Sequence, residues 1–143
     1  MAKLLTIKKI LVALDGSKNS LRGLDTAIYL ARQCGATITG ITVIPLYPKA
    51  LLLTPILYER EFSRAAKEFM AKAKKRSAQN GIVFNEKITI GHAVDIILDF
   101  AKEKKFDVIV IGARGFGTVK GIFLGSVSNA VVHKSKIPVL VIK

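Results

Sequence analysis

The residues best suited to chemistry lie in a glycine-rich stretch that runs from Gly112 to Ser126. Glycines allow main-chain N–H groups to approach an anion because no Cβ stands in the way. Gly125 and Ser126 are expected to begin a helix, with Ser126 as a candidate N-cap, and the dipole of a helix start favours negative charge. The Ser126 hydroxyl can donate to a phosphate oxygen, while Arg114 and Lys120 supply positive charge. The stretch from Gly112 to Ser126, which we call the glycine loop, therefore indicates a phosphate-binding loop.

Two better-known phosphate motifs do not fit this stretch. Gly112-x4-Gly117-Thr118 has the glycine spacing of a P-loop but lacks the lysine before the threonine. After Gly115-x-Gly117, Lys120 stands where a dinucleotide-binding motif has its third glycine. A tight turn without a ligand stays open as the alternative for a loop judged on its glycines alone.

The remaining polar candidates are few. Asp15 follows an apolar segment, so its carboxylate is expected to cap the next turn, to accept hydrogen bonds from ribose or adenine, or to do both. His92 and His133 have no spacing for a metal pair, and the single Cys34 excludes both an intrachain disulfide and a cysteine zinc cluster. Because no catalytic constellation is visible, the sequence does not indicate an enzyme, although slow ATP hydrolysis remains open.

Composition sets the wider class. The chain has 143 residues, a formal net charge of +13 and 50% hydrophobic residues, which excludes intrinsic disorder and fits a single domain over residues 1–143. No segment is apolar enough for a membrane span or a signal peptide, and the lone cysteine fits a reducing cytoplasm. The charge favours anionic partners, but few aromatic residues and no tryptophan make nucleic acid an unlikely one. The basic run at 67–77 is expected to be the solvated face of a helix.

The elements that must position these residues follow from hydrophobic periodicity. Strands and helices alternate, which predicts an α/β fold whose parallel sheet has helices on both faces. The predicted strands cover residues 7–14, 36–44, 82–89, 107–111 and 137–142, and the predicted helices cover residues 19–34, 55–80, 93–104 and 126–135.

Helical spacing also selects the residues expected to face the core. They are Leu21, Leu24, Ile28 and Ala31 in the first helix, Phe62, Ala66, Phe69 and Ala73 in the second, and Val94, Ile97, Leu98 and Ala101 in the third. The apolar connector 45–55 either packs locally on the core edge or forms a lid or partner surface.

The spacing Gly112-x2-Gly115-x9-Gly125-Ser126 resembles the signature of nucleotide-binding universal stress proteins. The resemblance extends along the chain, from ILVALDGS at its first strand to ITVIP at 41–45, GHAVDIIL at 91–98 and SKIPVLVIK at 135–143. The pair His92-Ala93 departs from the short acidic or proline-containing segment of many members.

The resemblance implies a single-domain, doubly wound, five-stranded parallel sheet of order 3-2-1-4-5, with the ligand at the carboxyl ends of strands one and four. It implies an ATP-binding stress-response protein that acts as a sensor or switch, with Mg²⁺ or Mn²⁺ carried by the triphosphate where a metal is present. The residues it places at the nucleotide are Ala13, Asp15, Val43, Gly112, Gly115, Gly125, Ser126, Val127 and Ser128, and the chemistry of Arg114 adds it as a phosphate contact.

The resemblance also implies a homodimer through the C-terminal strand, whose apolar edge invites pairing, and a downstream protein partner of unknown identity. Two alternatives stay open at this point. One is a slow ATPase, and the other is a basic module that binds nucleic acid or an acidic partner while the glycine loop is idle.

Overall fold

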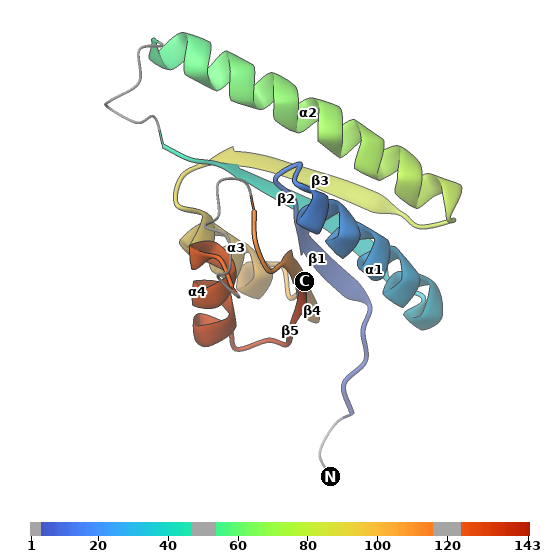
Figure 1. The fold of residues 1–143 in the computed structure, drawn as a ribbon. Helices are drawn as coiled ribbons and strands as arrows, with labels where there is room; N and C mark the ends of the chain where they lie inside the picture. The colour runs from blue at the N-terminus through green and yellow to red at the C-terminus, as the bar shows by residue number, and fades with distance from the viewer. Residues whose placement is uncertain (1–3, 47–53, 116–123) are drawn as a thin grey trace.

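The computed structural model describes residues 4–46, 54–115 and 124–143 (Figure 1). Lys120, the middle of the glycine-rich stretch and most of the apolar connector lie outside the described residues. The strands are β1 (Lys9–Ala13), β2 (Thr37–Ile44), β3 (Phe84–Ile90), β4 (Val108–Gly112) and β5 (Val139–Ile142). The helices are α1 (Lys18–Cys34), α2 (Pro55–Gln79), α3 (Ala93–Glu103) and α4 (Ser126–Lys134).

The strands form a parallel sheet in the order β3-β2-β1-β4-β5, which confirms the predicted fold class. β1 is central, and it pairs with β2 on one side and with β4 on the other. The chain therefore runs from β1 toward one edge of the sheet and from β4 toward the other edge. The carboxyl ends of β1 and β4 form the point at which this direction switches. Open α/β sheets bind ligands at this position.

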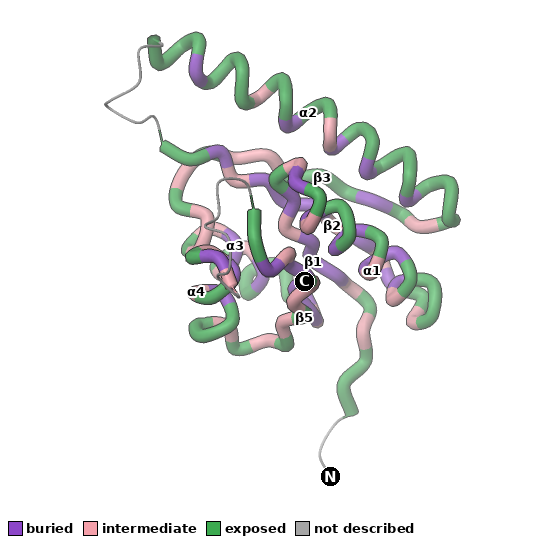
Figure 2. Tube along the Cα trace, viewed as in Figure 1, coloured by how far each residue is buried: buried purple, intermediate pink, exposed green. Residues whose placement is uncertain are grey.

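Helices cover both faces of the sheet (Figure 2). On one face, α1 and α2 pack on a core that includes Ile10, Val12, Leu24 and Met70. On the other face, α3 and α4 pack on a core that includes Leu11, Ile41, Ile97, Ile109 and Val131. Within the described ranges, no helix is long and apolar enough to cross a membrane.

Local signals explain where the first two helices begin and end. The Ser17 hydroxyl accepts a hydrogen bond from Ser20 N–H and caps α1, which ends at Gly35 in the left-handed conformation (φ 66°). Thr54 caps α2 in the same way through Leu57 N–H, and Pro55 occupies the first turn. Arg76 near the end of α2 forms an ion pair with Asp25 of α1 at 2.5 and 3.0 Å, and this hydrogen-bonded partner raises the pKa of Arg76.

Two expectations about core-facing residues were wrong. Leu21 is 40% exposed and Phe62 is 43% exposed, although both fit the helical spacing of a buried face. The buried residues of α2 are Tyr58, Ala66, Met70, Ala73 and Ser77. Leu21 is not among the buried residues of α1, which include Leu24, Ile28 and Ala31. For Phe62 the reason is that α2 is longer than the strand it packs on: 25 helical residues extend about 37 Å, whereas the seven residues of β3 extend only about 23 Å. The N-terminal end of α2 therefore extends past the end of β3, as Figure 1 shows.

Candidate functional site

A cavity of about 530 Å³ lies at the carboxyl ends of β1, β2 and β4. The middle of α2 borders it on one side, and the N-termini of α3 and α4 border it on the other. This volume suits a small organic ligand. All ten residues predicted for the site line it, namely Ala13, Asp15, Val43, Gly112, Arg114, Gly115, Gly125, Ser126, Val127 and Ser128.

The N-terminus of α4 carries no side-chain cap. Gly125, with φ −73° and ψ 168°, is the N-cap, so the expectation that Ser126 would be the N-cap was wrong. Ser126 is instead the first helical residue, and its side chain is exposed at the cavity. A helix start leaves its first N–H groups without intrahelical partners, so α4 presents donors and a positive dipole end to the cavity.

The base of the glycine loop is closed by hydrogen bonds. Ala113 C=O accepts from Gly125 N–H at 2.6 Å and from the Ser128 hydroxyl at 2.7 Å. Ser128 is buried, and its hydroxyl also lies 3.1 Å from Gly125 C=O. We therefore assign the Ser128 hydroxyl a structural role at the loop base. Its main-chain N–H, in the first turn of α4, is the group left for the predicted phosphate contact.

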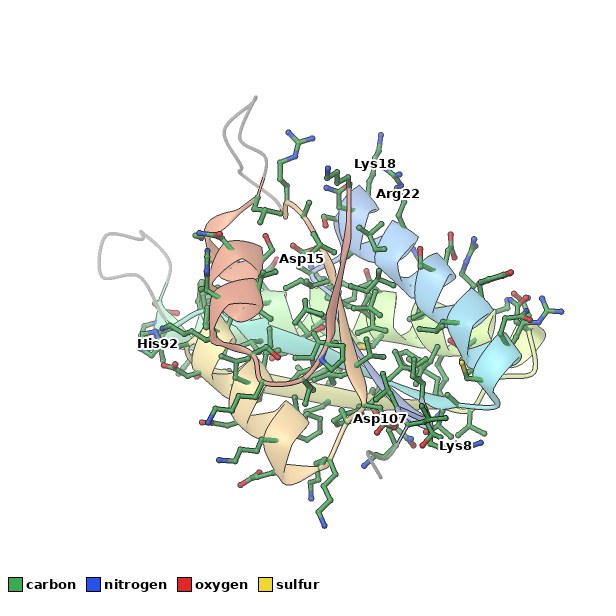
Figure 3. All side chains as sticks on the ribbon, turned by 90° about the horizontal axis from the view of Figure 1, so that it is seen from below. Lys8, Asp15, Lys18, Arg22, His92 and Asp107 are labelled. Atoms are coloured by element: carbon green, nitrogen blue, oxygen red, sulfur yellow. The ribbon has the colours of Figure 1, made fainter. Side chains whose placement is uncertain are left out.

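Asp15 lies between the start of α1 and the glycine loop (Figure 3). Its Oδ1 accepts a hydrogen bond from Ser17 N–H at 2.8 Å, so the predicted turn-capping role of Asp15 is confirmed. Its Oδ2 lies against Gly115, in the space that a Cβ at position 115 would need. The side chain is exposed and is the only carboxylate among the described cavity residues. One carboxylate oxygen thus serves the turn, while the other faces the loop.

The register of β2 presents the main chain of Val43 to the cavity. Ile41 C=O accepts from Leu14 N–H at 2.9 Å, and the β1–β2 ladder ends there with Ala13 opposite Ile41. Two residues farther along a strand, the main-chain groups point to the same side. Val43 therefore directs its N–H and C=O past the end of β1, where the cavity lies.

Several cavity residues were not anticipated from the sequence. On α2 they are Phe62, Ala65, Ala66 and Phe69, of which three were expected to be ordinary core residues, and on α3 they are Ala93 and Ile97. One sequence signal for the cavity wall was available: Ala65 and Ala66 stand between Phe62 and Phe69, two aromatic residues seven positions apart on a helix. Thr42, Ser17 and Ser20 also line the cavity, but their hydroxyls form hydrogen bonds with the nearby chain.

The donor set fits an anion better than a bare metal ion. In the part of the chain that the structure describes, no three His, Cys, Asp or Glu side chains gather as metal ligands. Arg114 is the one cationic side chain among the described cavity residues. A helix start, an arginine and a glycine-bordered space can hold phosphate oxygens, while an apolar wall and one carboxylate can hold a nucleoside.

Comparisons of the sequence agree with one another on the family. The profile of the Universal stress protein family matches residues 6–143. Universal stress protein YxiE of Bacillus subtilis is 32% identical over 148 residues, covering 94% of this chain and 98% of that protein. Universal stress protein MJ0531 of Methanocaldococcus jannaschii is 32% identical over 139 residues, covering 95% of this chain and 82% of that protein.

Solved structures are similar over nearly the whole chain. Hypothetical protein MJ0577 superposes with a TM-score of 0.86 at 27% identity, covering 96% of both chains. A universal stress protein in complex with cAMP has a TM-score of 0.74 at 27% identity, covering 95% of this chain and 97% of its own. The universal stress protein of Archaeoglobus fulgidus in complex with dAMP has a TM-score of 0.72 at 26% identity, covering 98% and 100%. Adenine nucleotides are thus bound by two proteins of this fold.

Proposed function

The chain belongs to the universal stress protein family, and from that premise we propose that it binds ATP in the cavity and acts as a nucleotide-dependent switch in the stress response. The observation that carries the proposal is the uncapped start of α4, which faces the same cavity as Asp15 and the main chain of Val43. One end of the cavity thus offers donors for phosphate, and the other offers groups for a nucleoside.

We assign the adenine end of the cavity from the main-chain groups of Val43. A main-chain N–H and C=O on one strand edge form a donor and acceptor pair at fixed spacing. Adenine has the complementary pair, because its exocyclic amino group donates and a neighbouring ring nitrogen accepts. In this proposal, Asp15 accepts a hydrogen bond from a ribose hydroxyl through the oxygen that Ser17 does not use.

We assign the phosphate end of the cavity from the start of α4 and the glycine loop. The N–H groups of Ser126, Val127 and Ser128 and the helix dipole favour the phosphate oxygens, and the Ser126 hydroxyl adds a donor. Arg114 provides the mobile positive charge that a triphosphate needs. In this proposal, a divalent cation arrives bound to the triphosphate, because the described residues offer no cluster to hold it alone.

The proposed switch couples this cavity to the molecular surface. Nucleotide binding stabilises one arrangement of the chain around the phosphates, and a partner protein that prefers that arrangement reads it. We further propose that the chain is one cytoplasmic domain over residues 1–143 that dimerises through β5. β5 is an edge strand, and Leu140 on it is 37% exposed.

Isothermal titration calorimetry with ATP, ADP, AMP and cAMP tests the proposal. We expect saturable heat with ATP and a strong loss of affinity in Gly115→Val, whose side chain would fill the space against Asp15. Asp15→Asn should also weaken binding, whereas Asp99→Asn, at an exposed acid on α3 outside the cavity, should not. Absence of heat and of a thermal shift with ATP would refute the proposal.

A further inference from the structure

Four residues on one side of α2 form a wall of the cavity, which we call the α2 wall: Phe62, Ala65, Ala66 and Phe69. Its ends are held in place by contacts to the rest of the fold. The Phe62 ring packs on the Tyr58 ring with centroids 4.5 Å apart, and the Tyr58 hydroxyl donates to Pro45 C=O at 2.9 Å, just past β2. The Phe69 ring lies 3.0 Å from where a Cβ of Gly16 would stand, beside the turn after β1.

The α2 wall lies on one side of the layer in which a base would sit. A base that pairs with the main-chain groups of Val43 must lie beyond the end of β1, in the plane of the sheet. α2 packs on one face of the sheet, whereas α3 packs on the other face and contributes Ala93 and Ile97 to the cavity. The space for a base is therefore bounded by α2 on one side and α3 on the other.

The small side chains of the α2 wall set the width of that space. Ala66 is 1% exposed and packs inward, while Ala65 is exposed and lines the cavity. Ala65 therefore faces the open volume, with an aromatic ring of the α2 wall on each side along the helix. A larger residue at position 65 would extend into the cavity without disturbing the buried core.

We propose that the α2 wall contacts the face of the base, and that Ala65 is the specificity-determining residue that leaves room for a two-ring base. The inference rests on the proposed function, and it extends that function to residues outside the glycine signature. A purine presents a larger face to the α2 wall than a pyrimidine does, so the cavity prefers purine nucleotides. Contact of apolar and aromatic side chains with the face of a base does not depend on the groups at the edge of the base. In this proposal, the main chain of Val43 recognises the edge.

Calorimetry on the full chain with Ala65→Leu tests this inference, and Ala71→Leu is the matched control. Ala71 is exposed on the same helix and does not line the cavity. The probes are ATP, CTP and inorganic tripolyphosphate. We expect Ala65→Leu to weaken ATP binding about tenfold or more, to weaken CTP binding less, and to leave tripolyphosphate binding within about twofold. Ala71→Leu should match the unsubstituted chain for all three probes.

The outcomes separate this inference from the proposed function. If the unsubstituted chain gives no heat with ATP, the proposed function fails and the inference with it. If the unsubstituted chain binds ATP, and Ala65→Leu binds it as tightly as Ala71→Leu, the inference alone is overturned. Equal losses for ATP and tripolyphosphate would also overturn it, because the substitution would then act through the phosphate site.

A second pair of variants removes contact instead of adding bulk. Phe62→Ala should weaken ATP binding severalfold and leave tripolyphosphate binding unchanged. Leu57→Ala is its control, because Leu57 and Phe62 are each 43% exposed on α2 and only Phe62 lines the cavity. Equal ATP affinity in the two variants would show that Phe62 does not contact the base.

Discussion

The Asp15 carboxylate lies against Gly115, with its Oδ2 in the space that a side chain at position 115 would occupy. The contact joins the end of β1 to the first part of the glycine loop. Its Oδ1 accepts a hydrogen bond from Ser17 N–H at the same time, so the exposed carboxylate contacts both a turn and a loop. Glycine at 115 is therefore required by the position of Asp15.

Substituting Gly115 by alanine should displace Asp15 without unfolding the protein. The methyl group meets the end of an exposed, movable side chain, so we expect the free energy of unfolding to change by less than about 1 kcal/mol. ATP affinity should fall, because the nucleoside then loses a correctly placed carboxylate. Urea unfolding and calorimetry measure the two effects separately.

A double-mutant cycle with Asp15→Ala shows whether the effect passes through that contact. Coupling is expected only between residues that touch, so Gly115→Ala should cost little additional affinity once Asp15 is alanine. Additive losses in the double variant would show that Gly115 acts independently of Asp15.

The two serines at the start of α4 should respond in opposite ways to alanine. Ser128→Ala removes a buried hydroxyl that donates to Ala113 C=O, so we expect a loss of about 1 kcal/mol of stability in urea unfolding. Ser126→Ala removes an exposed hydroxyl, so stability should stay unchanged while ATP affinity decreases. The opposite pattern would reverse the structural and ligand-binding roles assigned to these side chains.

The order of elements was predictable because each is marked by a strong local signal. The apolar run at β4, the β-branched residues of β2 and Gly35 after α1 each indicate an element boundary without tertiary information. The phase of α2 was harder to predict. Phe62 has the spacing of a core residue, yet it is 43% exposed because it lines the cavity beyond the ends of β1, β2 and β4. Periodicity reports which side of a helix is apolar, and it does not report where the sheet ends.

The glycine signature predicted one end of the cavity, to which the proposed function assigns the phosphates, because its spacing is local in sequence. The α2 wall escaped prediction since its contribution depends on how far α2 projects and on the position of Phe69 beside Gly16. The contact between Asp15 and Gly115 depends on the adjacency of β1 and β4, which is a property of the topology. Ser126 and Gly125 are both plausible N-caps by residue type, and only the main-chain angles of Gly125 distinguish them.

Changing Gly23 of α1 and Gly40 of β2 to alanine should have opposite effects on the free energy of unfolding. At Gly40 of β2, a Cβ would lie 2.5 Å from the Phe84 ring and 3.0 Å from Leu14, so Gly40→Ala should lose about 1–3 kcal/mol of stability. At Gly23 of α1 the nearest atom would be 3.7 Å away, so Gly23→Ala should gain up to about 1 kcal/mol through helix propensity. Thermal and urea unfolding measure both, and equal effects would contradict the packing seen around Gly40.

A lysine on the β5 edge should prevent the proposed dimer. An edge strand pairs with a symmetry mate through its free main-chain groups, and a charged side chain at the centre of that strand opposes pairing. We expect Leu140→Lys to give a monomer by light scattering at a concentration where the unsubstituted chain is a dimer. Val83→Lys is the control, because Val83 is 63% exposed beside β3 at the opposite edge of the sheet. A monomeric unsubstituted chain, or a monomer from Val83→Lys and not from Leu140→Lys, would contradict dimerisation through β5.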